Sequence, residues 1–88
     1  MKRSRVLISG EVQGVFFRDT CRRLASEHGI GGWVRNLRDG RVEAVFEGAD
    51  DRVDLMVAWA RRGPSGARVA DVTVSSETPE GLTGFAIR

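Results

Sequence analysis

The chain has 88 residues, enough for one small domain with a modest core, and we expect that domain to span residues 1–88. Its 14 basic and 12 acidic side chains leave a net charge of +2, a mild bias toward anionic ligands and not the dense basic face of a nucleic-acid-binding protein. Cys21 is the only cysteine and the apolar run 6–8 is too short for a signal peptide or membrane span, which excludes an internal disulfide and predicts a cytoplasmic protein.

The first third of the chain predicts a strand followed by a helix. The side chains of residues 5–12 alternate in a pattern that predicts a strand with both faces partly covered. From Phe17 to about Gly29, apolar side chains recur at helical spacing, and Gly29 supplies a helix stop. This stripe comprises Phe17, Cys21, Leu24, Ala25 and His28.

The middle of the chain predicts a β-hairpin. Its strands are residues 33–37 and 41–48, in which Val42, Ala44 and Phe46 alternate with Glu43, Val45 and Glu47. Asp39-Gly40 lies between them and is a dipeptide typical of tight turns.

The last part of the chain predicts a second helix and two strands. Ala49-Asp50-Asp51 offers a cap and two acidic residues for a helix that ends before Gly63-Pro64. Residues 69–74 predict a fourth strand, 75–83 a polar connection, and 85–87 a short final strand. The order β-α-β-β-α-β with a closing strand predicts a ferredoxin-like α+β sandwich, with both helices on one face of a mostly antiparallel sheet.

One stretch suits an anion: the run Gly10-Glu11-Val12-Gln13-Gly14-Val15-Phe16-Phe17-Arg18. A strand that turns tightly into a helix leaves several backbone N–H groups unpaired, and these groups and the helix dipole favour negative charge. Gly10 and Gly14 permit backbone angles that side chains disfavour, and Arg18 offers a planar fork for phosphate oxygens. On chemistry alone, an ordinary connecting turn beside a surface arginine explains the run equally well.

A second stretch, residues 32–40, contains a polar residue where apolar ones are expected. Along the predicted strand Val34 and Asn36 share one face, and asparagine is disfavoured in strands. Two explanations stay open for Asn36. It begins the hairpin bend, or its amide holds a water or a substrate oxygen.

Together the two stretches resemble the acylphosphatase family. The first is similar to that family's first signature in the pattern Gly10-x-Val12-Gln13-Gly14-Val15-x-Phe17-Arg18. The second is similar in the pattern Gly32-Trp33-Val34-Arg35-Asn36-x-x-Asp39-Gly40-x-Val42-Glu43. The likeness covers the chain from about Val6 to Ile87, with family-like size and element order.

The resemblance implies hydrolysis of the carboxyl–phosphate mixed anhydride of small acyl phosphates, without a metal or other cofactor. It also implies that Arg18 binds the phosphate and that Asn36 orients the attacking water. The backbone amides that hold the phosphate would be those of Glu11, Val12, Gln13, Gly14, Val15, Phe16 and Phe17. Inorganic phosphate is then both product and inhibitor, and we expect a monomer that binds neither nucleic acid nor membrane.

Other side chains with chemical potential are better explained by structure. We expect His28 and Cys21 to be structural, and Asp50 and Asp51 to serve the start of a helix rather than a metal. Glu43 and Glu47 share one strand face but have no acid–base partner in the sequence pattern, and both tryptophans are expected to pack.

Two rival functions belong to other classes. An RNA-binding ferredoxin-like sheet would carry several aromatic residues on its central strands, whereas residues 42–46 carry one. A non-catalytic module of a larger enzyme is the second rival. The chain looks complete at both ends, which favours a free-standing enzyme.

Overall fold

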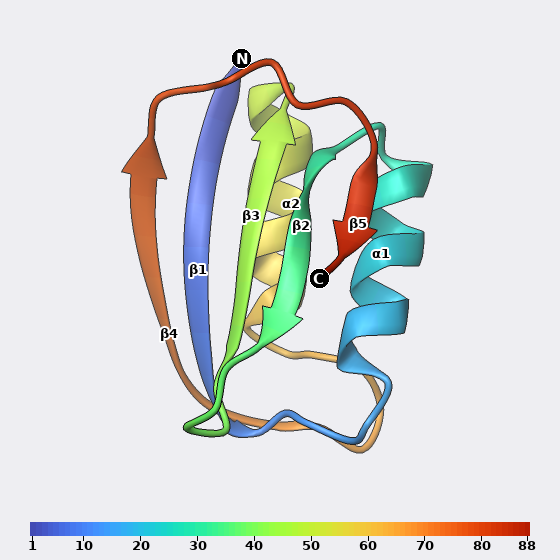
Figure 1. Cartoon of the computed structure of the whole chain (residues 1–88), viewed down its shortest axis with the longest axis vertical. Coiled ribbons are helices and arrows are strands. Elements are labelled where there is room, and N and C mark those ends of the chain that lie inside the picture. Colours follow the sequence, from blue (N-terminus) through green and yellow to red (C-terminus); the bar gives the residue numbers. More distant parts are fainter.

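Five strands form one mixed sheet, and both helices pack against the same face of it (Figure 1). The computed structural model describes all of residues 1–88. The strands lie in the order β4-β1-β3-β2-β5; β5 is parallel to β2, and every other pair is antiparallel. The elements are β1 (Lys2–Glu11), α1 (Phe17–Glu27), β2 (Gly31–Asn36), β3 (Val42–Gly48), α2 (Asp50–Ala60), β4 (Arg68–Glu77) and β5 (Phe85–Ile87). The predicted ferredoxin-like fold is confirmed.

The core lies between the sheet and the helices, as the apolar patterns predict. Val6 and Ile8 of β1 are fully buried on the helix-covered face. The helices contribute Phe17, Cys21, Ala25, Val53, Met56 and Ala60. Both helices cover the same face of the sheet, so the opposite face of the sheet carries no helix. Neither helix has the length and apolar character needed to cross a membrane.

Two strands are longer than the sequence pattern predicts. β1 begins at Lys2 and not at residue 5, and β4 continues to Glu77 through a segment predicted as a connection. The two extensions pair with each other, with Arg3 opposite Glu77, and their side chains form an ion pair with 2.8 Å between Arg3 Nε and Glu77 Oε1. Charged strand residues are stable here because their partners lie on the neighbouring strand.

The start of α2 differs from prediction in its chemistry. Asp50 and Asp51 lie inside the first turn, and the N-cap residue, Ala49, has no side chain that caps the helix. The acidic residues therefore stabilise the helix through its dipole and not by capping.

The helix-free face of the sheet carries two buried carboxylates that the sequence pattern left unexplained. Glu43 is fully buried between Arg5 and Arg35, with 2.6 Å between Arg35 Nε and Glu43 Oε1. Glu47 accepts backbone N–H bonds of 2.7 to 2.8 Å from three residues of the β4–β5 connection, namely Glu80, Gly81 and Leu82. Glu47 thus fixes the connection that leads into β5.

We expect Glu47 to be a main determinant of stability. Burial raises the pKa of Glu47, but the backbone N–H bonds and Arg3 outweigh burial, so its pKa lies below the ordinary value of 4.5. A carboxyl group whose pKa falls on folding stabilises the protein above its unfolded-state pKa and loses this effect as the pH falls through its folded-state pKa. Glu47→Gln should lower the free energy of unfolding by about 3 kcal/mol at neutral pH, because an amide NH₂ then faces the backbone donors.

Urea unfolding as a function of pH measures this effect. The difference between wild-type and Glu47→Gln should shrink as the pH falls below 4.5 and disappear below the lower folded-state pKa of Glu47, where the wild-type carboxylate is neutral as well. Glu27→Gln is the matched control, because Glu27 is an exposed helix residue and its loss should change stability by less than about 0.5 kcal/mol. An equally small effect at Glu47 would contradict this role.

Candidate active site

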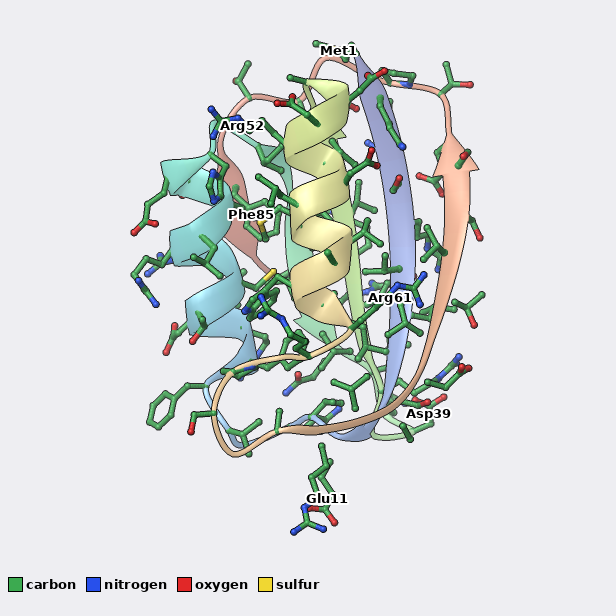
Figure 2. All side chains as sticks on the ribbon, turned by 180° about the vertical axis from the view of Figure 1, so that it is seen from behind. Met1, Glu11, Asp39, Arg52, Arg61 and Phe85 are labelled. Carbon is green, nitrogen blue, oxygen red and sulfur yellow. The ribbon has the colours of Figure 1, made fainter.

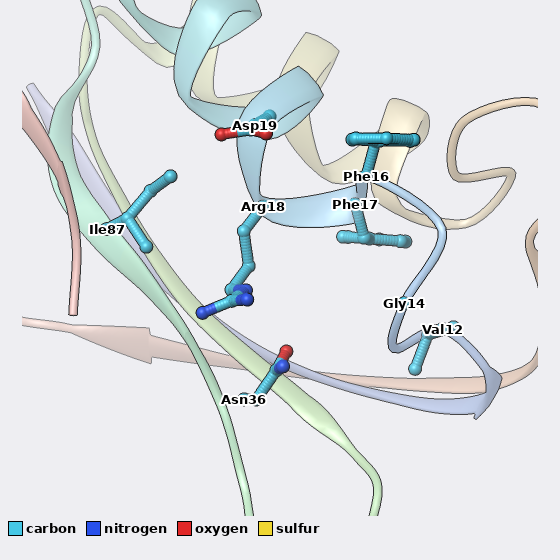
Figure 3. A pocket seen from close by; sticks show the side chains of 8 residues that line it. All are labelled: Val12, Gly14, Phe16, Phe17, Arg18, Asp19, Asn36 and Ile87. Carbon is cyan, nitrogen blue, oxygen red and sulfur yellow. The ribbon is translucent and has the colours of Figure 1, made fainter.

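A cavity of about 400 Å³ opens where β1 ends and α1 begins. Its wall comes from the loop between these elements, from α1, from the end of β2 and from β5 (Figure 3). The residues that line it are Val12, Gly14, Phe16, Phe17, Arg18, Asp19, Asn36 and Ile87. Arg18 and Asn36, the two residues singled out in the sequence, therefore lie in one cavity.

The loop over residues 12–16 presents backbone N–H groups without backbone acceptors. None of these five N–H groups donates a backbone hydrogen bond, and the first helical bond of α1 runs from Thr20 N–H to the Phe16 oxygen at 3.1 Å. The first-turn N–H groups of α1 lack helical partners as well, as at any helix start. The loop and the helix start thus provide consecutive donors at the positive end of a helix dipole.

Positive φ angles at Gly14 and Phe16 give the loop its curl. Gly14 has φ +73°, and a Cβ atom added there would meet no atom within 4 Å, so its requirement is conformational and not steric. Phe16 adopts the left-handed conformation (φ 58°, ψ 27°) as the N-cap of α1 and makes no side-chain cap. Glycine accepts this region of backbone space easily and other residues seldom do.

Gly10 and Glu11 belong to β1 and lie before the loop. A Cβ atom on Gly10 would lie 2.1 Å from the Arg68 oxygen, so glycine is needed for the close approach of β1 and β4 at a register shift. Glu11 is the last residue of β1, and its side chain points away from the molecule (Figure 2). Glu11, Gln13 and Val15 do not line the cavity.

The Arg18 guanidinium points into the cavity toward Asn36 (Figure 3). Arg18 is an exposed residue in the first turn of α1. Unlike the arginines on the helix-free face, it forms no ion pair with a carboxylate. Its five donors are therefore available to an anion in the cavity.

Asn36 ends β2 and lies on the same face of the sheet as Val34, as the strand alternation predicts. Its Oδ1 atom is buried without a hydrogen-bond partner. Because Asn36 lines the cavity, a water or a bound group inside the cavity can donate a hydrogen bond to this acceptor. The side chain makes no bond to the hairpin turn, which disfavours the explanation that Asn36 serves the bend.

Other side chains hold the hairpin turn and connect it to the loop. Asp39 accepts hydrogen bonds from the backbone and side chain of Arg41. The side-chain amide of Gln13 donates to the backbone oxygens of Leu37 at 2.8 Å and of Arg41 at 3.0 Å. The residue after Asn36 is therefore tied to the loop, a contact that sequence reasoning missed because it joins two distant segments.

Sequence reasoning also missed Asp19 and Ile87 as cavity residues. Asp19 follows Arg18 on the first turn of α1, and its position directly after the first signature could have indicated that it lines the cavity. Ile87 reaches the cavity because β5 pairs in parallel with β2, opposite Val34, and no local pattern indicates this pairing.

Neither Cys21 nor His28 lines the cavity, as predicted. Cys21 is buried in the core, and burial raises the pKa of its thiol. His28 follows the far end of α1, where its Nδ1 lies 2.9 Å from Nη1 of Arg52 on α2. Trp59 packs against Phe17 with 5.0 Å between ring centroids, whereas Trp33 lies near the guanidinium groups of Arg35 and Arg88.

Comparison with known proteins identifies the family of the chain. The family model described as Acylphosphatase matches residues 4–87. The chain is 55% identical over 86 residues to an acylphosphatase of Haloquadratum walsbyi (98% of this chain, 92% of the relative) and 57% identical over 88 residues to one of a Roseiflexus species (99% and 95%). The crystal structure of acylphosphatase from Bacillus subtilis is similar with a TM-score of 0.95 at 34% identity, over 100% of this chain and 99% of that one. With a matching fold and nearly full coverage in each comparison, the chain belongs to the acylphosphatase family.

Proposed function

We propose that the chain hydrolyses small acyl phosphates in this cavity, with Arg18 and the backbone amides of residues 12–17 binding the phosphate and Asn36 orienting the attacking water. The observation that carries the proposal is the convergence of three features on one cavity. These are an arginine without an ion pair, a row of N–H groups without backbone acceptors, and a buried amide oxygen without a partner.

The charge in the cavity suits the phosphoryl group throughout the reaction. The phosphate is anionic in the substrate, and its oxygens stay charged in the transition state, so donors held in place by the fold stabilise both. Arg18 supplies a full positive charge on rigid helix geometry, and the loop supplies N–H groups from the start of the same helix. No reorganisation of these donors is needed during the reaction.

The chemical step follows from an in-line displacement at phosphorus. Asn36 Oδ1 accepts a hydrogen bond from a water and aims its oxygen at phosphorus; the new P–O bond forms as the bond to the acyl oxygen breaks. The acyl group leaves as a carboxylate, and both protons of the water remain on phosphate oxygens, so the second product is dihydrogen phosphate. Because a carboxylate is a weak base, with a pKa of about 4, its departure requires no protein acid.

The simplest test is phosphate release from acetyl phosphate by the purified chain. We expect turnover well above the rate without enzyme, and little turnover of p-nitrophenyl phosphate, whose leaving group is a stronger base. We also expect activity to persist in a strong chelator, since no group of three His, Cys, Asp or Glu side chains is placed to hold a metal. Absence of release would contradict the proposed function, and loss with a chelator reversed by a metal would contradict metal independence.

Inorganic phosphate should bind as a competitive inhibitor and raise the melting temperature by mass action. Gly14→Val should lower the affinity for phosphate at least tenfold and so weaken both effects, since a β-branched residue is strongly disfavoured at φ +73° and would reshape the loop. Gly29→Val is the matched control: Gly29 has φ +66° and equally open surroundings, but it follows the far end of α1. A Gly14→Val protein with wild-type phosphate affinity would remove the loop from the binding site.

We further infer a monomeric, cytoplasmic enzyme made of one domain over residues 1–88. Glu43 and Glu47 form ion pairs with Arg3, Arg5 and Arg35 on the helix-free face, and this pairing of charges within the chain supports a monomer that binds no nucleic acid. The single buried thiol suits a reducing compartment. A dimer mass in sedimentation velocity would contradict the monomer.

A further inference from the structure

The Gln13 side chain joins two parts of the candidate site, although it does not line the cavity. Its amide nitrogen lies 2.8 Å from the Leu37 oxygen and 3.0 Å from the Arg41 oxygen, so both of its N–H bonds are used. Gln13 belongs to the loop between β1 and α1, whereas Leu37 directly follows Asn36 at the end of β2. One side chain thus links the loop that supplies backbone donors to the strand that carries Asn36.

The hairpin between β2 and β3 does not need this link for its own closure. Leu37 N–H donates to the Arg41 oxygen at 2.8 Å, and Gly40 N–H donates to the Leu37 oxygen at 3.2 Å. Asp39 accepts two further bonds from Arg41. Both oxygens that Gln13 contacts therefore have another donor, and loss of the glutamine side chain leaves neither of them unpaired. Burial does not explain the residue either, because Gln13 is exposed.

The loop, by contrast, depends on Gln13 for its polar contacts. Packing holds Val12, which is buried, and Val15, which is partly buried against the core. The backbone groups of residues 12–15 form no hydrogen bond with other backbone groups. Gln13 is also the only one of these four residues whose side chain forms a hydrogen bond. Its two bonds therefore fix the exposed part of the loop relative to the hairpin.

The proposed reaction depends on how these two parts of the site are placed. The phosphate is held by the loop and α1, and the attacking water is held by Asn36 at the end of β2. In-line attack requires the water and phosphorus to be close and aligned, and a misplacement of about 1 Å can cost about a hundredfold in rate. Asn36 Oδ1 has no partner within the protein, so its position follows from the backbone that carries it. Gln13 holds the next residue of that backbone.

We propose that the Gln13 side chain is a positioning residue that fixes the loop relative to Asn36 and so aligns the water with phosphorus. This inference rests on the proposed function and adds a residue to its mechanism. The Gln13 amide acts through Asn36 and contacts neither the water nor the phosphate. This role is separate from that of the Gln13 backbone N–H, which is one of the phosphate donors of the loop.

A double-mutant cycle with acetyl phosphate tests this role. Gln13→Leu keeps the approximate size of the side chain and removes both donors. We expect it to lower kcat about tenfold and to change the inhibition constant of inorganic phosphate less than about twofold, because Arg18 and the backbone donors remain. In the Asn36→Ala protein, the same change should lower kcat by less than about a further twofold, since the group that Gln13 positions is already absent. If Gln13 only stabilised the fold, the two losses in kcat would multiply.

Ser9→Ala is the matched control, because the Ser9 hydroxyl also donates to a distant backbone oxygen, that of Asp71 at 3.5 Å, outside the cavity. It should keep the wild-type kcat and phosphate inhibition constant. Gln13→Leu should fold, because the side chain is exposed and its two acceptors keep other donors.

Three results for folded Gln13→Leu would overturn the inference. These are a wild-type kcat, an equal loss of kcat with and without the Asn36 amide, and a loss of phosphate affinity as large as the loss of kcat. Wild-type protein that does not hydrolyse acetyl phosphate would instead contradict the proposed function.

Discussion

Arg18→Ala should lower kcat/KM for acetyl phosphate by about three orders of magnitude or more. This is the loss expected when an arginine that stabilises a transferring phosphoryl group is removed. Arg18 points into the cavity and is not neutralised by a carboxylate, so its charge is available to the phosphate at every stage of the reaction. The variant should therefore lose phosphate affinity as well as turnover. Steady-state kinetics with inorganic phosphate as inhibitor measures both.

Two further variants make the Arg18 result specific. Lysine at position 18 should rescue poorly, because it keeps the charge but loses the planar fork. Arg22→Ala removes an exposed arginine from the same helix, outside the cavity, and should keep wild-type kinetics. Circular dichroism checks that each protein is folded. An Arg18→Ala enzyme with a wild-type inhibition constant for phosphate would exclude Arg18 from the binding site.

Asn36→Ala should reduce kcat by about two orders of magnitude or more and leave phosphate affinity nearly unchanged, because losing one positioned polar group affects the transition state only. The Oδ1 atom makes no bond within the protein, so its removal breaks no structural contact. The melting temperature of the variant should accordingly be close to that of wild-type. The split between kcat and phosphate affinity separates the role of Asn36 from that of Arg18.

Two other results for Asn36→Ala would assign a different role to Asn36. A variant with near-normal turnover but lower stability would show that Asn36 serves the hairpin and not the reaction. A variant that loses phosphate affinity to the same extent as Arg18→Ala would place the amide on the phosphate itself and not on the water.

Local patterns were sufficient for the element order and for most of the core. The apolar stripe of α1 and the alternation of β3 follow from neighbouring residues, and both are present as predicted. The positions of Arg18 and Asn36 in two signature-like stretches indicated that these residues matter. Their meeting in one cavity depends on α1 packing beside β2, which the fold class implies.

Contacts between distant segments were not predictable in the same way. The extension of β4 to Glu77 depends on charged pairs with β1, and charged residues locally favour a loop. The bonds from Glu47 to the β4–β5 connection and from Gln13 to the hairpin turn join segments whose pairing no local pattern reveals. Ile87 reaches the cavity for the same reason, through the parallel pairing of β5 with β2.

The most direct test of water attack at phosphorus is to follow the oxygen of the attacking water. When acetyl phosphate is hydrolysed by the enzyme in ¹⁸O-labelled water, a water aimed at phosphorus by Asn36 must place the label in inorganic phosphate. Mass spectrometry of both products, corrected for the reaction without enzyme, measures its distribution. We expect one labelled oxygen in phosphate and none in acetate. Label in acetate would mean attack at the carbonyl carbon and would contradict the role proposed for Asn36.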